Sequence, residues 1–244
     1  PTTPTATATP TPTPTSATPT AVRVVVVSDT HGYERSLTQN RVDDETLGTL
    51  PDGDVLIHCG DFQVEGPQSH KLRADAAFDA WLAAQPHAHK IVVRGNHDAM
   101  GLSFPRSNAQ YVTRPTFLTV ANLSIGILPF SRGRLKAPLR PCELLVSHVP
   151  PKGVRDKCYN GDRAGSKFLR DAVERCVSKP RVWLCGHIHE SRGYEACTFG
   201  ASFGASFSGK SGAKKVANSV PTTLVVNAAN ANCGVAKRLV HPPI

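Results

Sequence analysis

The residues best suited to chemistry lie in five short segments that are rich in Asp, Asn and His. They are Asp29 and His31, then Asp61, then Asn96, His97 and Asp98, then His148, and finally His187 and His189. Oxygen and imidazole donors in this mixture suit Mn²⁺, Fe or Zn²⁺ better than Ca²⁺ or Cu(I). One such segment alone could be a simple turn or a surface histidine. Five of them in order indicate a shared metal centre.

Each segment directly follows a short apolar run that predicts a strand buried on both faces. The runs are Val22–Val27, Val55–Ile57, Ile91–Val93, Leu144–Val146 and Val182–Leu184. In open α/β sheets, ligands bind in the crevice outside the carboxyl ends of the strands. We therefore expect the five segments to converge. Gly60, Gly95 and Gly186 precede three of them, and glycine there allows a sharp turn, a positive φ angle and close approach of the backbone to a ligand.

Helical patterns alternate with these strands, so the chain predicts an α/β fold. Residues 68–85 predict one helix and residues 166–177 another, and a further strand is expected at Thr222–Val226. The expected inward-facing residues are Leu72, Ala76, Trp81 and Leu82 on the first helix and Phe168, Leu169, Ala172, Val173 and Cys176 on the second.

Two low-complexity segments flank or interrupt this pattern. Residues 1–20 contain ten Thr, six Pro and no charge, which predicts a disordered tail because no large apolar side chain offsets the entropy of ordering. Residues 198–219 are rich in Gly and Ser and predict a flexible loop between two strands. Residues 21–244 are therefore expected to form a single domain.

Composition narrows the class of protein further. The 28 basic and 19 acidic residues give a net charge of +9 and favour anionic partners such as phosphate esters or nucleic acid. No apolar run reaches the roughly 18–20 residues of a transmembrane helix.

The seven cysteines include no CxxC pair, which excludes a zinc knuckle or a thioredoxin-type motif. Cys59 and Cys185 lie in apolar runs, and free buried thiols favour a reducing, cytoplasmic compartment.

The ordered set of motifs resembles the calcineurin-like metallophosphoesterase superfamily over residues 22 to about 230. It comprises Asp29-x-His31, Gly60-Asp61, Gly95-Asn96-His97-Asp98, His148 and Gly186-His187-x-His189. Asp29–Gly32, His148–Asp156, Gly186–Glu190 and Val226–Ala229 are similar to its small metallophosphoesterase-domain branch, which includes animal fetal-brain proteins and bacterial cyclic-nucleotide phosphodiesterases. The implied fold consists of two packed mixed β-sheets flanked by helices, a four-layer sandwich.

The resemblance also implies two divalent metal ions and their ligands. One ion would be held by Asp29, His31, Asp61 and His189, and the other by Asp61, Asn96, His148 and His187. Asp61 would bridge the two ions. His97 would be the general acid, with Asp98 beside it to orient or tune its ring.

The implied reaction is hydrolysis of a small phosphate ester by in-line attack of a hydroxide that bridges the metal ions. Phosphodiesters, with cyclic nucleotides among them, are favoured over monoesters. Two divalent ions with two aspartates and one hydroxide keep roughly one positive charge, which attracts a phosphate anion. Asn96, a neutral ligand, preserves that surplus.

Three features depart from the branch or leave its roles open. The Trp-rich segment expected before His148 is replaced by Ile127–Phe130 and by a basic run at Arg132, Arg134, Lys136 and Arg140. Arg94 is a packing residue or an anion anchor. Arg155 and Asp156 either hold their loop as an ion pair or contact the substrate phosphate.

Two other functions compete with hydrolysis. One is a binding or scaffold protein with this fold and no turnover, which usually lacks several ligands, whereas here all seven ligand positions are filled. The other is a nuclease or nucleic-acid binder, which the net charge of +9 motivates and which a continuous basic groove would support.

Overall fold

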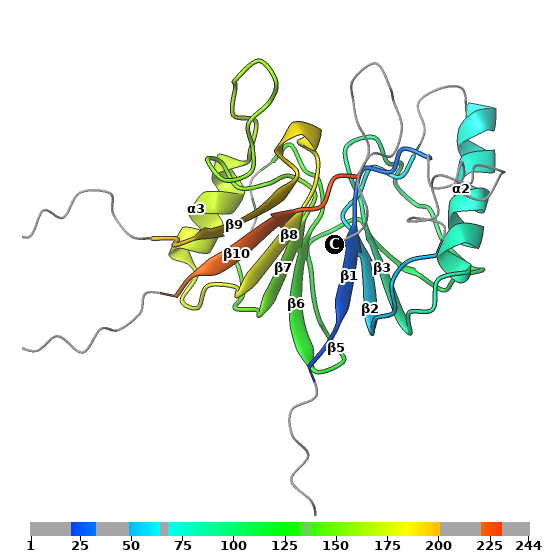
Figure 1. Ribbon diagram of the computed structural model, residues 1–244, viewed down its shortest axis with the longest axis horizontal. Coiled ribbons are helices and arrows are strands. Elements are labelled where there is room, and N and C mark those ends of the chain that lie inside the picture. The colour runs from blue at the N-terminus through cyan, green and yellow to red at the C-terminus, as the bar shows by residue number, and fades with distance from the viewer. Residues whose placement is uncertain are drawn as a thin grey trace, which may run out of the picture.

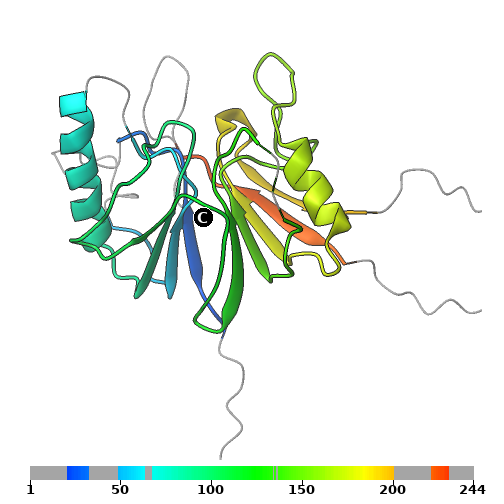
Figure 2. The same cartoon turned by 180° about the vertical axis from the view of Figure 1, so that it is seen from behind.

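The computed structural model describes residues 21–32, 49–63, 68–133, 135, 137–200 and 221–230. Two β-sheets stand side by side, with α2 and α3 on opposite outer sides (Figures 1 and 2). The tail predicted at residues 1–20 lies outside the described residues, as does nearly all of the loop predicted at 198–219. None of the described helices is long and apolar enough to cross a membrane.

The first sheet contains four parallel strands in the order β1-β2-β3-β4. Their bounds are β1 Val24–Val27, β2 Val55–His58, β3 His89–Val93 and β4 Gln110–Val112. The helix α2, Gln68–Ala83, connects β2 to β3, as a parallel pair requires a crossover. Over the described residues this sheet is therefore parallel and not mixed, which differs from the expectation of two mixed sheets.

The second sheet is mixed and has six strands in the order β5-β6-β7-β8-β10-β9. Their bounds are β5 Thr116–Val120, β6 Leu123–Leu128, β7 Leu144–Ser147, β8 Val182–Cys185, β9 Gly193–Cys197 and β10 Thr223–Asn227. The hairpin between β5 and β6 turns through Ala121 and Asn122, whose φ angles of 49° and 65° suit the tight turn of a twisted antiparallel pair. The strands β6, β7, β8 and β10 run parallel.

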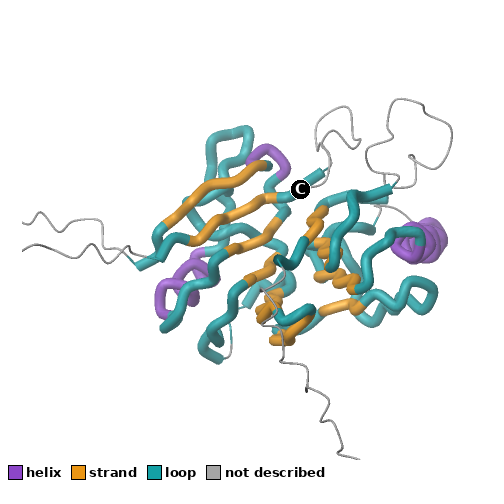
Figure 3. The backbone as a smooth tube through the Cα atoms, turned by 60° about the horizontal axis from the view of Figure 1, so that its bottom comes forward, coloured by secondary structure: helices purple, strands orange, loops and turns teal. Residues whose placement is uncertain are grey.

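Three apolar clusters define four layers. The inner faces of both sheets form the central cluster, to which Val26 and Ile57 contribute from one sheet and Val146 and Leu184 from the other. The outer face of the first sheet packs on α2, and that of the second packs on α3, Lys167–Arg175. The helix–sheet–sheet–helix sandwich is thus confirmed, and Figure 3 shows the two sheets as separate groups of strands. Because both faces of the central strands are buried, their sequences are continuously apolar.

The helices bury somewhat different faces from those expected. On α2, Ala76 is exposed, and the apolar layer is formed by Ala74, Phe78, Trp81 and Leu82, while the side chain of Leu72 lies outside the description. On α3, Phe168 is 43% exposed, whereas Ala172, Val173 and the capping residue Cys176 are buried against the second sheet as expected. Ser166 caps this helix by accepting a hydrogen bond from the Leu169 amide.

The two sheets are joined at the carboxyl end of β1. Ser28 forms an isolated parallel bridge with Ala229, and its amide donates to Asn230 Oδ1 at 3.0 Å. The Asn230 amide donates back to the Ser28 carbonyl at 2.8 Å. Cys59 and Cys185, at the ends of β2 and β8, are fully buried free thiols as predicted. The carboxyl ends of strands from both sheets therefore meet in one region.

Candidate metal centre

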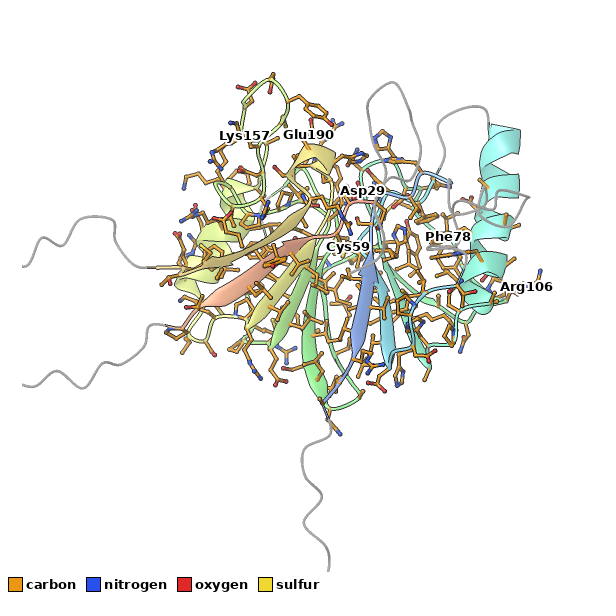
Figure 4. The ribbon with its side chains drawn as sticks, in the orientation of Figure 1. Asp29, Cys59, Phe78, Arg106, Lys157 and Glu190 are labelled. Atoms are coloured by element: carbon orange, nitrogen blue, oxygen red, sulfur yellow. The ribbon has the colours of Figure 1, made fainter. Side chains whose placement is uncertain are left out.

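Two compact groups of possible metal ligands lie where the strand ends meet. Asp29, His31 and His189 form the first cluster, and Asp61, His148 and His187 form the second cluster. Within each cluster the donor atoms all lie within 4.8 Å of one another. In both clusters the aspartate follows a strand of the first sheet, whereas His148, His187 and His189 follow strands of the second. Each cluster therefore contains side chains from both sheets. Figure 4 shows Asp29 between the two sheets, above Cys59.

The backbone is left-handed at four of these residues. The φ angles are 55° at Asp29, 47° at His31, 57° at Asp61 and 69° at His187. Asp and His tolerate this conformation better than most residues, but it still costs about 1–3 kcal/mol at each position. Such strain accumulates at functional sites, where the surrounding structure over-determines it. The strand ends are thus bent to aim these side chains at common points.

Gly95 and Gly186 make room for the two aspartates. A Cβ atom on Gly95 would lie 2.1 Å from Asp61 Oδ1, and one on Gly186 would lie 2.2 Å from Asp29 Oδ2. Both positions need glycine for space and not for a positive φ angle, which only Gly60 has among the three predicted turn glycines, at 108°. Gly60 is equally confined, because a Cβ there would lie 2.7 Å from His148 Nδ1. All three glycines thus let the backbone lie against proposed ligand side chains, whereas their predicted close approach to a bound ligand stays a prediction.

His148 presents an acceptor to the second cluster. Its Nδ1 lies 2.9 Å from the Cys59 carbonyl, which can only accept, so Nδ1 carries the proton and Nε2 faces the site. Nε2 lies 2.8 Å from Asn96 Oδ1 and 3.3 Å from Asp61 Oδ2. Burial lowers the pKa of His148, but the Asp61 carboxylate outweighs burial and raises it to about 9. A proton or a metal ion must therefore separate these three acceptor atoms.

Asp29 provides a similar acceptor in the first cluster. Its Oδ2 accepts a hydrogen bond from the His187 amide at 2.9 Å, whereas Oδ1 is buried and has no hydrogen-bond partner among the described residues. His189 Nε2 lies 3.3 Å from Oδ1. Burial raises the pKa of Asp29, but His189 and His148 reverse this effect and hold it well below its usual value. A buried charged oxygen without a donor fits a cation, so this donor set suits a divalent metal ion.

His97 and Asp98 lie on either side of the Asp61 backbone. The exposed His97 donates its amide to Asp61 Oδ1 at 2.9 Å, and its ring lies edge-on to that of His31 with 5.4 Å between centroids. The buried Asp98 carboxylate accepts four backbone amides. They belong to Asp61, Phe62, Gln63 and Gly95, at 2.7–3.1 Å. Asp98 therefore ties the loops after β2 and β3 together, a contact that the sequence did not predict.

His58 is a second residue that sequence reasoning missed. It is fully buried at the end of β2, where its Nδ1 accepts the Gly60 amide at 3.2 Å. Its Nε2 therefore carries the proton and donates to Thr30 Oγ1 at 2.9 Å. Burial lowers the pKa of His58 to about 3, so the ring is neutral. His58 connects the loop that carries Asp29 and His31 to the loop that carries Asp61, and nothing in the apolar run distinguished it.

The structure shows the contacts of Arg94 and Arg155, the two arginines whose roles the sequence left open. Arg94 donates to the Asp98 carbonyl from Nε and to the Phe130 carbonyl from Nη1, both at 3.0 Å. Asp156 is fully buried and pairs with Arg163 at 2.8 Å, so of the two roles left open, an ion pair between Asp156 and Arg155 is not found among the described residues. Arg155 instead donates to the carbonyl of Tyr194 in β9.

The fold and the two clusters define an α/β sandwich with metal-binding capacity at its strand ends. Residues 22–191 match the model of the calcineurin-like phosphoesterase family, and the chain belongs to this family. The match covers all seven predicted metal ligands as well as His97 and Asp98.

Several relatives share most of the domain. UPF0046 protein K07C11.7 of Caenorhabditis elegans is 29% identical over 207 residues, covering 70% of this chain and 65% of that protein. UPF0046 protein C25E10.12 of the same organism is 30% identical over 211 residues, with 70% of each chain covered. Metallophosphoesterase domain-containing protein 1 of Homo sapiens is 26% identical over 223 residues, covering 71% of this chain and 62% of that protein. The chain thus spans a little under two thirds of the first and third of these relatives.

Proposed function

We propose that this protein hydrolyses phosphate esters with two divalent metal ions, held by the first and second clusters. The observation that carries the proposal is the pairing of the two clusters, each with a buried aspartate opposite histidines of the other sheet. Asn96 adds a neutral oxygen beside His148 in the second cluster. Asp61 would serve both ions in this proposal, because its charge acts on His31 of the first cluster as well as on His148.

The metal ions, when bound, supply a hydroxide nucleophile at neutral pH and neutralise charge on the phosphate. Mn²⁺, Fe and Zn²⁺ fit the mixed oxygen and imidazole donors. The protein orients these donors in advance, because the Cys59 carbonyl fixes the tautomer of His148 and the His187 amide fixes the carboxylate of Asp29. Little reorganisation is then needed when substrate arrives.

His97 is the proposed general acid. It is exposed at the rim of the centre, its backbone is fixed on Asp61 Oδ1, and its ring lies against that of His31. An imidazole in this position reaches an ester oxygen that departs on the side of the first cluster and donates a proton to it. Asp98 fixes the turn that carries His97, and its predicted influence on the His97 ring is part of the proposal.

Phosphodiesters are the proposed substrates in preference to monoesters. This preference rests on the resemblance of the sequence motifs to the small metallophosphoesterase-domain branch alone. A scaffold role without turnover is less well supported, because the seven ligand positions are all occupied by metal-binding side chains.

The test is turnover after reconstitution with Mn²⁺, Fe²⁺ or Zn²⁺ across a panel of esters. The panel contains nitrophenyl phosphate, bis-nitrophenyl phosphate, and 2′,3′- and 3′,5′-cyclic nucleotides. We expect release of product from diesters that chelator abolishes and added metal restores. Two bound metal ions with no hydrolysis of any ester would contradict the proposal and favour the scaffold role.

A further inference from the structure

A cavity of about 970 Å³ opens beside the second cluster, and the proposed function assigns it no occupant. His187 forms part of its wall. Phe130, another wall residue, packs its ring 6.2 Å from the His187 ring and 6.1 Å from the His148 ring. The cavity is therefore continuous with the metal centre. Its volume is that of a site for a drug-sized organic group, far more than a phosphate alone needs.

The charged side chains lining this cavity have one sign. Arg94, Arg114 and Arg132 line it, and no Asp or Glu does so among the described residues. None of the three arginines forms an ion pair with a described carboxylate. Arg94 is fixed by the Asp98 and Phe130 carbonyls through Nε and Nη1. An anchored guanidinium in the same cavity wall as two exposed arginines is suited to a carboxylate or a phosphate.

The remaining wall is mostly apolar. Phe117, Leu128, Pro129 and Phe130 face the same cavity as the arginines. An occupant must therefore combine an apolar or aromatic body with a negative charge at some distance from the reacting phosphate. Free phosphate or a simple alkyl ester would leave most of this surface unused.

The position of His97 indicates which part of the substrate enters. His97 packs against His31 of the first cluster and is absent from the cavity wall, which instead contains His187 of the second cluster. A leaving group protonated by His97 thus departs on the other side of the centre. The cavity is left for the ester group that stays on the phosphate.

We infer that the protein prefers phosphodiesters whose retained group is apolar or aromatic and carries a second negative charge, bound by Arg94, Arg114 and Arg132. This inference rests on the proposed function and names its substrate class. It also gives a role to Arg132, which lies in the basic segment that replaces the Trp-rich segment of the branch. Arg134 and Lys136 of the basic segment lie outside the described residues.

Two chromogenic diesters with the same leaving group test the inference. They are 4-nitrophenyl 4-(carboxymethyl)phenyl phosphate and 4-nitrophenyl 4-methylphenyl phosphate, which differ by one remote carboxylate. We expect kcat/KM of the Mn²⁺-loaded protein to be about tenfold higher for the carboxylate ester, as a charge-assisted hydrogen bond would give. The ratio should fall as salt screens the arginines.

The combined variant Arg114→Gln/Arg132→Gln should bring this ratio towards one. Arg106→Gln is the control for the kind of substitution, because it removes one arginine charge from an exposed site beside α2 (Figure 4) and should keep the wild-type ratio. A ratio near one in the wild type, or a ratio unchanged in the double variant, would overturn the inference and leave the proposed function standing.

A second measurement separates this inference from the proposed function. The metal-free protein should bind 4-hydroxyphenylacetate about tenfold more tightly than 4-methylphenol in an NMR titration, with the difference lost in the double variant. If neither diester is hydrolysed, the proposed function fails. The titration alone then tests whether the cavity prefers an aromatic group that carries a negative charge. Equal binding of the two phenols would then reject this preference.

Discussion

The buried aspartates of the centre differ in the donors that surround them. Asp98 accepts four backbone amides, so its charge is satisfied by the fold. Asp61 accepts one amide, from His97, and its other oxygen faces His148 at 3.3 Å. Asp29 likewise has one oxygen without a hydrogen bond from any residue that the structure describes. The Asp98 carboxylate therefore holds the loops, whereas the carboxylates of Asp61 and Asp29 are available to bind cations.

Replacing Asp61 by Asn tests its proposed bridging role. The amide keeps the size of the side chain but removes the charge that both metal ions would share. We expect Asp61→Asn to bind fewer than two metal ions and to lose more than about 100-fold in kcat, measured by elemental analysis and nitrophenol release. Asp52→Asn, the same change at an exposed aspartate, should behave as wild type. Two bound metals and full activity in Asp61→Asn would contradict the bridging role.

The general-acid role of His97 predicts a dependence on the leaving group. In His97→Ala, hydrolysis of an alkyl diester should fall about 100-fold, because a poor leaving oxygen needs a proton. Hydrolysis of a nitrophenyl diester should fall only a few fold, because nitrophenolate departs without one. The measurement is kcat for both esters at fixed metal occupancy. Equal losses for the two esters would remove His97 from this role.

At the scale of the elements, a neutral histidine ring joins the loops after β1 and β2, in addition to the backbone hydrogen bonds between them. His58 packs edge-on against Phe62 and Phe78 and bonds to Thr30 and the Gly60 amide. In His58→Phe the packing surface remains, but the Gly60 amide and the Thr30 hydroxyl lose their partner inside the protein. The loops that carry Asp29, His31 and Asp61 then rest on their backbone hydrogen bonds, from Asp29 to the Gly60 carbonyl and from His31 to the Asp61 carbonyl, without the ring that braces them.

We expect His58→Phe to weaken Mn²⁺ binding by about tenfold and to reduce the free energy of unfolding by about 1–3 kcal/mol. Metal titration and urea unfolding of the metal-free protein measure the two effects separately. The matched control is His89→Phe, at the exposed start of β3. A loss of stability with unchanged metal affinity would show that His58 serves only the core.

The strands that the sequence predicted are those buried on both faces. β1, β2, β3, β7 and β8 coincide with the apolar runs that precede the chemical segments, and β10 coincides with the further strand expected at Thr222–Val226. β4, β5 and β9 are edge strands with half-exposed side chains, and Ser124 and Gly126 interrupt the apolar pattern of β6, so none of these gave a continuous run. Periodicity detects burial, and an edge strand is only partly buried.

The candidate site was predictable in its donors but not in its geometry. Donor types and their places after strands follow from the sequence, and the first and second clusters contain six of the seven proposed metal ligands. The left-handed backbone at Asp29, Asp61 and His187 was not predictable, because tertiary contacts and not local preference impose it. The contacts of His58 and Asp98 also depend on loops brought together from different strands.

At the scale of the whole molecule, each cluster joins the two sheets. Asp29 and His31 follow β1 and face His189, which follows β8, whereas Asp61 follows β2 and faces His148 and His187. Elsewhere the sheets meet through the apolar cluster between their inner faces and the bridge between Ser28 and Ala229. A metal ion bound to either cluster would therefore hold both halves together, and the unfolded chain would lose this arrangement.

Metal binding should accordingly raise the stability of the entire domain. At a free Mn²⁺ concentration 100 times the Kd, one site adds about 2.7 kcal/mol to the free energy of unfolding, which for a chain of this length raises Tm by roughly 5–10 °C. Calorimetry should show one transition whose Tm increases with the logarithm of Mn²⁺ concentration and returns to its starting value with chelator. Ca²⁺ is the control ion, because it prefers all-oxygen sites and should shift Tm little. In Asp61→Asn the increase should be smaller. Two separate transitions, of which Mn²⁺ moves only one, would mean that the clusters do not link the sheets.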